Sequence, residues 1–82
     1  MTENDIRQIL LATLEELFEL DPATIKGDTN LYEDLEIDSI DAIDLIDHIK
    51  RQTGYKLQAE DFKTVRTVDD VVHAFAKKIR DD

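Results

Sequence analysis

The stretch that decides the fold is residues 35–49, LEIDSIDAIDLIDHI, in which isoleucine, leucine and aspartate recur at helical spacing. At 3.6 residues per turn the apolar side chains share one broad arc, which consists of Ala42, Ile43, Leu45, Ile46 and Ile49. Aspartates occupy the opposite arc. The pattern predicts an amphipathic helix that begins after the cap Asp38 and ends near Gly54, a residue suited to a left-handed C-terminal cap.

Two residues at the start of this helix need a separate explanation. Ser39 stands among aspartates, and Ile40 is placed on the acidic arc, where its side chain is exposed. Serine is common in a first helical turn, so a purely structural role is one interpretation. The N–H groups and positive dipole end of a helix start also favour a phosphate esterified to the serine, although Asp38 and Asp41 oppose its charge. From the residues alone, both interpretations stay open.

The rest of the chain predicts three further helices and no strand. Apolar residues at steps of three and four predict helices over residues 3–20 and from the cap Thr67 onward, with a short helix at 59–64 between the motif helix and the last. Residues 21–38 form a long connection, and its apolar residues predict an ordered loop: Ile25, Leu31, Leu35 and Ile37. We therefore expect an all-α fold, a small four-helix bundle in a single domain over residues 1–82.

The charge balance limits the possible partners. The chain has 82 residues, with 20 acidic and 10 basic side chains, so its formal net charge is −10. Nucleic acid and anionic membranes would be repelled, whereas basic protein surfaces are complementary. The absence of cysteine excludes disulfides, thiol nucleophiles and thiolate metal sites. The longest apolar run, ILLATL, is too short for a membrane span, and the acidic start does not resemble a signal peptide. We expect a cytoplasmic protein without stable membrane insertion.

The search for catalytic and metal sites gives no candidate. A nucleophilic Ser39 would need a base, but His48 lies more than two turns along the same helix and His73 lies on another helix. A calcium-binding loop starting at Asp28 would have Glu33 at its glycine position and Ser39 in place of the bidentate glutamate. We therefore expect neither catalytic residues nor a metal site.

The sequence DSID at residues 38–41, preceded by LYEDLEI and followed by AIDLIDHI, resembles the attachment motif of acyl carrier proteins. The resemblance extends over almost the whole chain and includes GYKL and TVRTVDDVV. It implies a four-helix bundle in which Ser39 carries a 4′-phosphopantetheine arm, added from coenzyme A by a phosphopantetheinyl transferase that uses magnesium. It also implies that the thiol of the arm holds acyl groups as thioesters, while the protein itself supplies no catalytic group.

The resemblance further implies a docking face and an acyl pocket. The docking face consists of Asp38, Ile40, Asp41, Asp44 and Asp47. Its partners would be the transferase, ketosynthases and other acyl-processing enzymes with basic surfaces. The carrier itself would be a monomer. The acyl pocket would lie between the second and third helices and consists of Ile46, Ile49, Phe62 and Val65. Because Phe62 fills a position that is often small in fatty-acid carriers, we expect long saturated chains to be poorly buried.

Basic residues distinguish this chain from the usual fatty-acid carriers, whose motif helix continues with glutamates. The basic residues are Lys50, Arg51, Lys56, Lys63 and Arg66. The combination of LYEDLEIDSIDAIDLI with TGYKL and FKTVRTVDDVV is more similar to specialised free-standing carriers of bacterial secondary pathways, such as those that make aryl polyenes or related polyketide lipids. The competing interpretation is an acidic helical adaptor that binds a basic partner protein and uses Ser39 only structurally.

Overall fold

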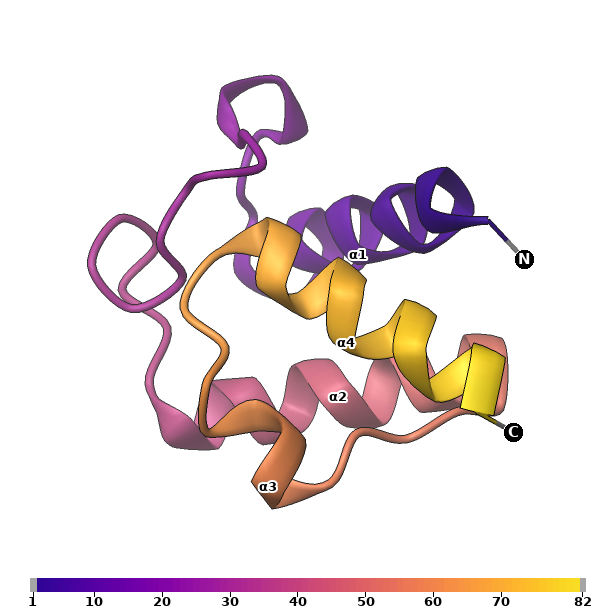
Figure 1. Cartoon of the computed structure of the whole chain (residues 1–82). Coiled ribbons are helices and arrows are strands. Elements are labelled where there is room, and N and C mark those ends of the chain that lie inside the picture. The colour runs from indigo at the N-terminus through magenta and orange to yellow at the C-terminus, as the bar shows by residue number, and fades with distance from the viewer. Residues whose placement is uncertain (1, 82) are drawn as a thin grey trace.

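Four α-helices and one 3-10 turn make up the fold in the computed structural model, which describes residues 2–81 (Figure 1). The elements in chain order are α1 Glu3–Phe18, η1 Pro22–Thr24, α2 Ser39–Thr53, α3 Ala59–Phe62 and α4 Val68–Asp81. The all-α prediction is confirmed. Within the described residues, extended pairing is limited to an isolated bridge between Asn30 and Thr67. No helix in this part of the chain is both long and apolar enough to cross a membrane.

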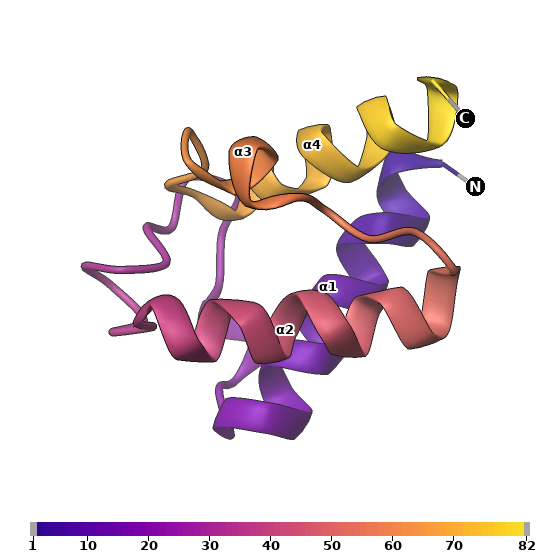
Figure 2. The same cartoon turned by 90° about the horizontal axis from the view of Figure 1, so that it is seen from below.

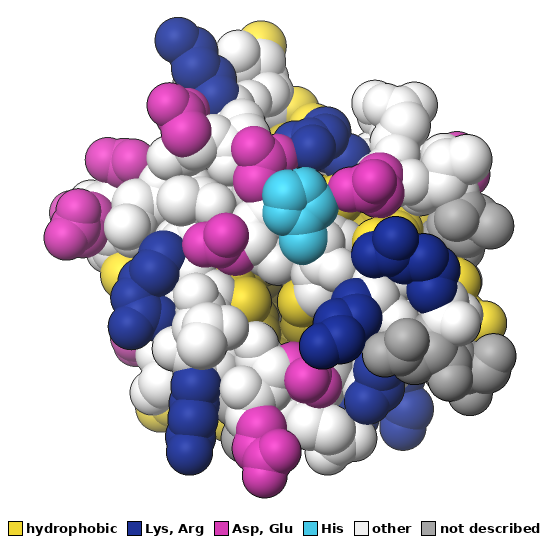
Figure 3. All heavy atoms as spheres, in the orientation of Figure 1, with side chains coloured by type: hydrophobic (Ala, Val, Ile, Leu, Met, Phe, Trp, Pro, Cys, Tyr) yellow, Lys and Arg dark blue, Asp and Glu magenta, His cyan; other side chains and the backbone are white. Residues whose placement is uncertain are grey.

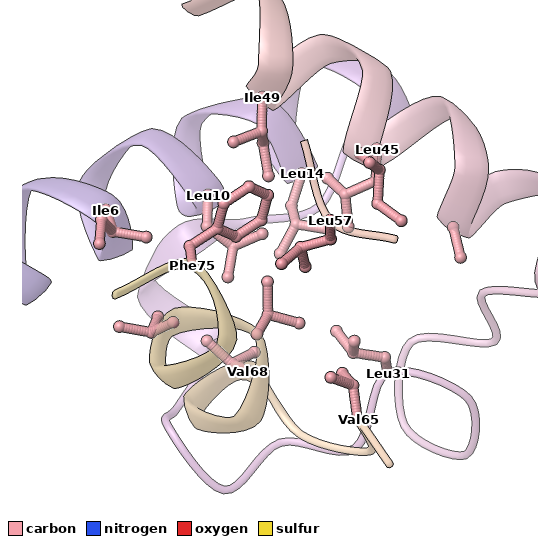
Figure 4. Close-up of a cluster of buried hydrophobic side chains, with 14 of the residues drawn as sticks. Ile6, Leu10, Leu14, Leu31, Leu45, Ile49, Leu57, Val65, Val68 and Phe75 are labelled. Atoms are coloured by element: carbon pink, nitrogen blue, oxygen red, sulfur yellow. The ribbon is translucent and has the colours of Figure 1, made fainter. Parts of the chain in front are cut away.

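The central helix is α1, which packs against both α2 and α4, while α3 packs on α4. Figure 2 shows α1 crossing behind α2. Side chains of the three long helices meet in one core, together with residues of the connecting segments (Figure 4). Among its most deeply buried members are Leu10, Leu14, Leu31, Leu45, Ile49, Leu57, Val65 and Phe75. Burial of such side chains contributes about 1.5–3 kcal/mol each.

The apolar arc predicted for α2 is too broad by one residue. Ala42, Leu45, Ile46 and Ile49 are buried, but 62% of Ile43 is exposed. At about 100° per residue, Ile43 lies roughly 60° beyond Ile46 on the helix surface. Since α1 is the helix that packs directly on α2, it covers the centre of the apolar arc and leaves this flank open.

Backbone and side-chain caps fix the helix ends where the sequence places cap residues. Gly54 ends α2 with φ 82° and donates its N–H to the Lys50 carbonyl at 2.7 Å. At the start of α4, the Asp70 carboxylate accepts from the N–H groups of Arg66 and Thr67, each at 3.0 Å. The hydrogen bonds from Arg66 and then Thr67 lower the pKa of Asp70. Local hydrogen bonding therefore fixes the entry into α4.

The long connection between α1 and α2 is ordered, as predicted. Ile25, Leu31 and Ile37 are buried in the core. The backbone of the loop is tied to the approach to α4, because Leu31 N–H donates to the Arg66 carbonyl at 2.8 Å and Val68 N–H donates to the Thr29 carbonyl at 3.1 Å. These contacts hold the loop against α4 at the end where α2 begins.

Candidate functional site

Ser39 is the first residue of α2, and its side chain is exposed. The carboxylate of Asp38 accepts hydrogen bonds from the N–H groups of Ile40 at 3.0 Å and Asp41 at 2.9 Å. In return, the Asp41 carboxylate accepts from the Asp38 N–H at 3.5 Å. This reciprocal cap fixes the first turn and leaves the Ser39 hydroxyl at the surface.

The cap changes one expectation about phosphate binding. The sequence suggested that free N–H groups at the helix start would favour a phosphate on Ser39. Two of them, on Ile40 and Asp41, instead donate to Asp38. Because the Asp38 side chain already accepts from these two N–H groups, they are not free to donate to a phosphate on Ser39. Such a phosphate would need hydrogen-bond donors from other groups.

A surface depression of about 250 Å³ opens beside Ser39, and we term it the Ser39 groove. Its lining residues are Tyr32, Ser39, Ala42, Ile43, Ile46, Phe62 and Lys63. They come from the long loop, from α2 and from the α3 end, and Figures 1 and 2 both show α3 beside the N-terminal half of α2. Most of the lining is apolar, so the groove suits an aliphatic or aromatic group better than a charged one.

A second depression, of about 280 Å³, adjoins the Ser39 groove along α2. Ile43 and Ile46 line both depressions, and the second one extends to Lys56, Leu57 and Gln58. The flank of α2 that carries Ile43 therefore lines two adjoining depressions.

Of the four residues predicted for an acyl pocket, two line the Ser39 groove and two are buried in the core. Ile46 and Phe62 line the Ser39 groove together with Ser39 itself. Ile49 and Val65 are 1% and 2% exposed and belong to the core. Sequence reasoning missed Ile43 as a groove residue, although its place four residues after Ser39 puts both on one side of the helix.

The exposed face of α2 combines apolar and acidic side chains. Ile40 and Ile43, which are 69% and 62% exposed, are the large hydrophobic side chains that stand most clear of the core in the described part of the chain. Asp44 and Asp47 are exposed on the same face, whereas Asp41 is half-buried and serves in the cap. The structure thus brings Ile40, Asp44 and Asp47 together and gives Asp38 and Asp41 a structural role as well.

Among residues 2–81, the histidines and acidic side chains form no second site. The ring of His48 lies 3.3 Å from the Asp44 carbonyl, and the ring of His73 lies 3.5 Å from Glu3. Neither histidine makes a hydrogen bond to Ser39. In residues 2–81, no three acidic or histidine side chains gather as metal ligands. The face over α4 mixes basic and acidic side chains rather than concentrating one sign (Figure 3).

Comparisons with known proteins agree with this geometry. A family model described as a phosphopantetheine attachment site matches residues 8–75. Acyl carrier protein 2 of Ralstonia nicotianae is 42% identical over 74 residues, which cover 90% of this chain and 91% of that protein. The meromycolate extension acyl carrier protein of Mycolicibacterium smegmatis is 28% identical over 81 residues, covering 99% of this chain and 81% of the relative. Ser39 and the Ser39 groove lie within the matched residues.

Proposed function

Because this chain belongs to the phosphopantetheine-attachment family of acyl carrier proteins, we propose that Ser39 is the residue that carries its 4′-phosphopantetheine arm. The protein carries acyl intermediates of fatty-acid or polyketide-type biosynthesis. The observation behind the proposal for Ser39 is its exposed hydroxyl at a rigidly capped helix start, beside an apolar groove. When attached, the arm supplies a terminal thiol that holds acyl groups as thioesters.

The residues around Ser39 fit such a group. The capped turn presents the hydroxyl to a transferase, because the hydrogen bonds between Asp38 and Asp41 hold the backbone on both sides of it. Ser39 is also the only serine in the chain. Beside it, Ile43, Ile46 and Phe62 offer an apolar surface for the arm or its cargo. Ile49 and Val65 lie in the core and would contribute to an acyl site only if the groove deepened.

Partner enzymes would dock on the exposed face of α2. Ile40 and Ile43 supply apolar contacts, and Asp44 and Asp47 supply negative charge for basic surfaces. Complementary charge speeds encounter without requiring tight binding, which suits a carrier that must also dissociate. The phosphopantetheinyl transferase, ketosynthases and other acyl-processing enzymes are the proposed partners of a monomeric, cytoplasmic and non-catalytic protein.

The basic end of α2 would restrict the choice of partner. Lys50 and Arg51 are exposed one to three turns beyond the acidic residues. A partner must therefore present basic groups near Ser39 and acidic or neutral groups further along α2. We infer that this carrier serves a specialised pathway rather than housekeeping fatty-acid synthesis.

Intact mass spectrometry tests the assignment of Ser39. Wild type, Ser39→Ala and Thr64→Ala are incubated with coenzyme A, magnesium and a broad-range phosphopantetheinyl transferase. Thr64 is a suitable control because it is an exposed hydroxyl residue near α3. Wild type and Thr64→Ala should gain one arm, while Ser39→Ala should fold normally and gain none. An arm on Ser39→Ala would refute the assignment, and an unmodified wild type with several transferases would favour an adaptor that binds basic partners without a prosthetic group.

A further inference from the structure

Among the described residues that line the Ser39 groove, Lys63 is the single charged side chain. It follows Phe62, the last residue of α3, and is exposed. A lysine can lay its aliphatic stem along an apolar wall while its ammonium group remains in water. Lys63 therefore places a mobile positive charge at the edge of the groove that contains Ser39.

A phosphate on Ser39 would otherwise meet mostly negative charge. Asp38 and Asp41 flank the serine, and the Asp38 carboxylate already accepts from the N–H groups of Ile40 and Asp41. These two donors are consequently not available to the phosphate. The positive end of the α2 dipole remains, but it contributes only about 0.3–1 kcal/mol at an exposed site. A phosphate on Ser39 would therefore need a positively charged group from outside α2 to balance its charge.

Two other basic residues near α3, Arg66 and Lys78, are already engaged. The Arg66 guanidinium donates to the carbonyl oxygens of Lys63 and Val65, at 2.9 and 3.0 Å, and so closes the turn after α3. Lys78 lies 3.8 Å from the Asp61 carboxylate. For Lys63, no carboxylate of the described residues lies within ion-pair distance.

The acidic residues of α3 are directed elsewhere. Glu60 and Asp61 line a different hollow, of about 360 Å³, which lies between α3 and α4. The Asp61 carboxylate also accepts from the Gln58 N–H at 3.0 Å. The acidic side chains of α3 thus line the hollow beside α4, whereas Lys63 lines the Ser39 groove.

We propose that Lys63 binds the phosphate through which the arm is attached to Ser39, and thereby directs the first part of the arm along the Ser39 groove. The proposal rests on the attachment at Ser39 proposed above and adds a positioning residue to it. Lysine suits this role because its ammonium is a compact charge on a flexible stem and needs no fixed geometry. At the surface, such a pair changes a local equilibrium by about 1.4- to 5-fold.

The test uses the loaded 82-residue chain in four forms: wild type, Lys63→Gln, Lys63→Arg and Lys56→Gln. Lys56 is the matched control because it is exposed and lines the second depression without lining the Ser39 groove. Mass spectrometry first establishes that each form carries the arm on Ser39. Phosphorus-31 NMR then reports the environment of the phosphate, and amide NMR reports which residues respond when the unloaded form is converted to the loaded one.

For wild type, Lys63→Arg and Lys56→Gln, we expect one common phosphorus resonance position and shifts of the amides at positions 62 and 63 on loading. In Lys63→Gln the phosphorus resonance should move, and the loading shifts at Phe62 should shrink severalfold. Raising the ionic strength to about 1 M, where charges are screened within about 3 Å, should move the wild-type resonance toward the Lys63→Gln position.

Two failures are distinguishable. If Ser39 is loaded but Lys63→Gln and wild type give the same spectra at low salt, Lys63 does not bind the phosphate and the assignment of Ser39 stands. If Lys56→Gln moves the resonance as much as Lys63→Gln does, the effect is one of net charge and the proposal is overturned. If no arm is found on Ser39, both proposals are refuted.

Discussion

Asp38 and Asp41 cap one another across the first turn of α2: the Asp41 N–H donates to the Asp38 carboxylate at 2.9 Å, and the Asp38 N–H donates to the Asp41 carboxylate at 3.5 Å. Both residues were expected to serve in partner recognition. Their hydrogen bonds show that they also hold the backbone on either side of Ser39. The two roles of these aspartates, capping the helix and binding partners, can therefore be separated by substitutions that remove the charge but keep the capping oxygen.

Asp38→Ala should destabilise the protein by about 0.5–2 kcal/mol, because Ala cannot accept from the N–H groups of Ile40 and Asp41. Asp38→Asn keeps a capping oxygen and removes the charge, so its loss of stability should be much smaller. Urea unfolding gives both values. If capping is the main role of Asp38, transferase loading should slow for Asp38→Ala and stay near wild type for Asp38→Asn. An equal slowing of both variants would instead show that the transferase recognises the negative charge of Asp38.

The exposed isoleucines of α2 should matter for transfer and not for folding. Ile40→Ala and Ile43→Ala remove side chains that are mostly exposed, so the free energy of unfolding should change by no more than about 0.5 kcal/mol. Burial of a whole side chain against a partner is worth about 1.5–3 kcal/mol and is not screened by salt. Transfer by the transferase and by a ketosynthase should therefore fall about tenfold or more at every salt concentration.

Leu45→Ala provides the opposite control for these variants. Leu45 is fully buried on the same helix, so its truncation should cost about 2–5 kcal/mol of stability. Should Ile43→Ala destabilise the protein to a similar extent, the open flank described for α2 would be wrong.

The charges of α2 should act on partner choice through screened interactions. Asp44→Lys should reduce transfer severalfold, since each exposed ion pair is worth about 0.2–1 kcal/mol, and added salt should shrink the difference. Replacing Lys50 and Arg51 together by Glu should raise the rate of acyl transfer by fatty-acid enzymes, because the carriers that these enzymes usually use resemble this one but are acidic at these positions. Salt-dependent kinetics measure both effects. No effect of Asp44→Lys at low salt, or no gain from the double variant, would show that the docking face is assigned wrongly.

The sequence predicted those features that depend on local pattern. The helix order, the cap Asp38 and the C-terminal Gly54 follow from residue types at fixed spacing, and the structure confirms them. The exposure of Ile40 was also predicted, because helical geometry alone removes it from the apolar arc.

Features that depend on neighbouring elements were less accessible. Ile43 was assigned to the apolar arc, but periodicity cannot tell how much of that arc the other helices cover. The Ser39 groove combines Tyr32 of the loop with Phe62 and Lys63 of the α3 end, which lie far from Ser39 in sequence. The capping bonds of Asp38 were compatible with the sequence, but their effect on a phosphate at Ser39 became evident only from the hydrogen bonds themselves.

Asp70 should make the stability of the protein depend on pH in the acid range. Hydrogen bonds from the backbone of Arg66 and Thr67 lower its pKa from the ordinary value of 3.8. A group whose pKa is lower in the folded state stabilises the protein above its unfolded pKa, and this stabilisation is lost as pH falls through the folded pKa. Asp70→Asn should therefore be less stable than wild type near neutral pH, and the difference should shrink below pH 3.8. Thermal unfolding across this range measures it, with Asp47→Asn as a control for net charge; a constant difference would contradict the prediction.

Phe62 should limit how deeply an acyl cargo enters the protein. Its ring lines the Ser39 groove beside Ile46, while Ile49 and Val65 are already packed in the core. A filled interior offers little volume for expansion, so an octanoyl chain should lie largely along the surface. NMR spectra of octanoyl and unloaded protein should then differ little around Phe62, with little change in stability.

Phe62→Ala removes the ring, so the same cargo should produce larger shifts and a higher melting temperature relative to its unloaded form. Phe18→Ala, a truncation of another partly buried phenylalanine outside the groove, should not have this effect. Large shifts and clear stabilisation by octanoyl in the wild type would show that the groove opens despite the ring.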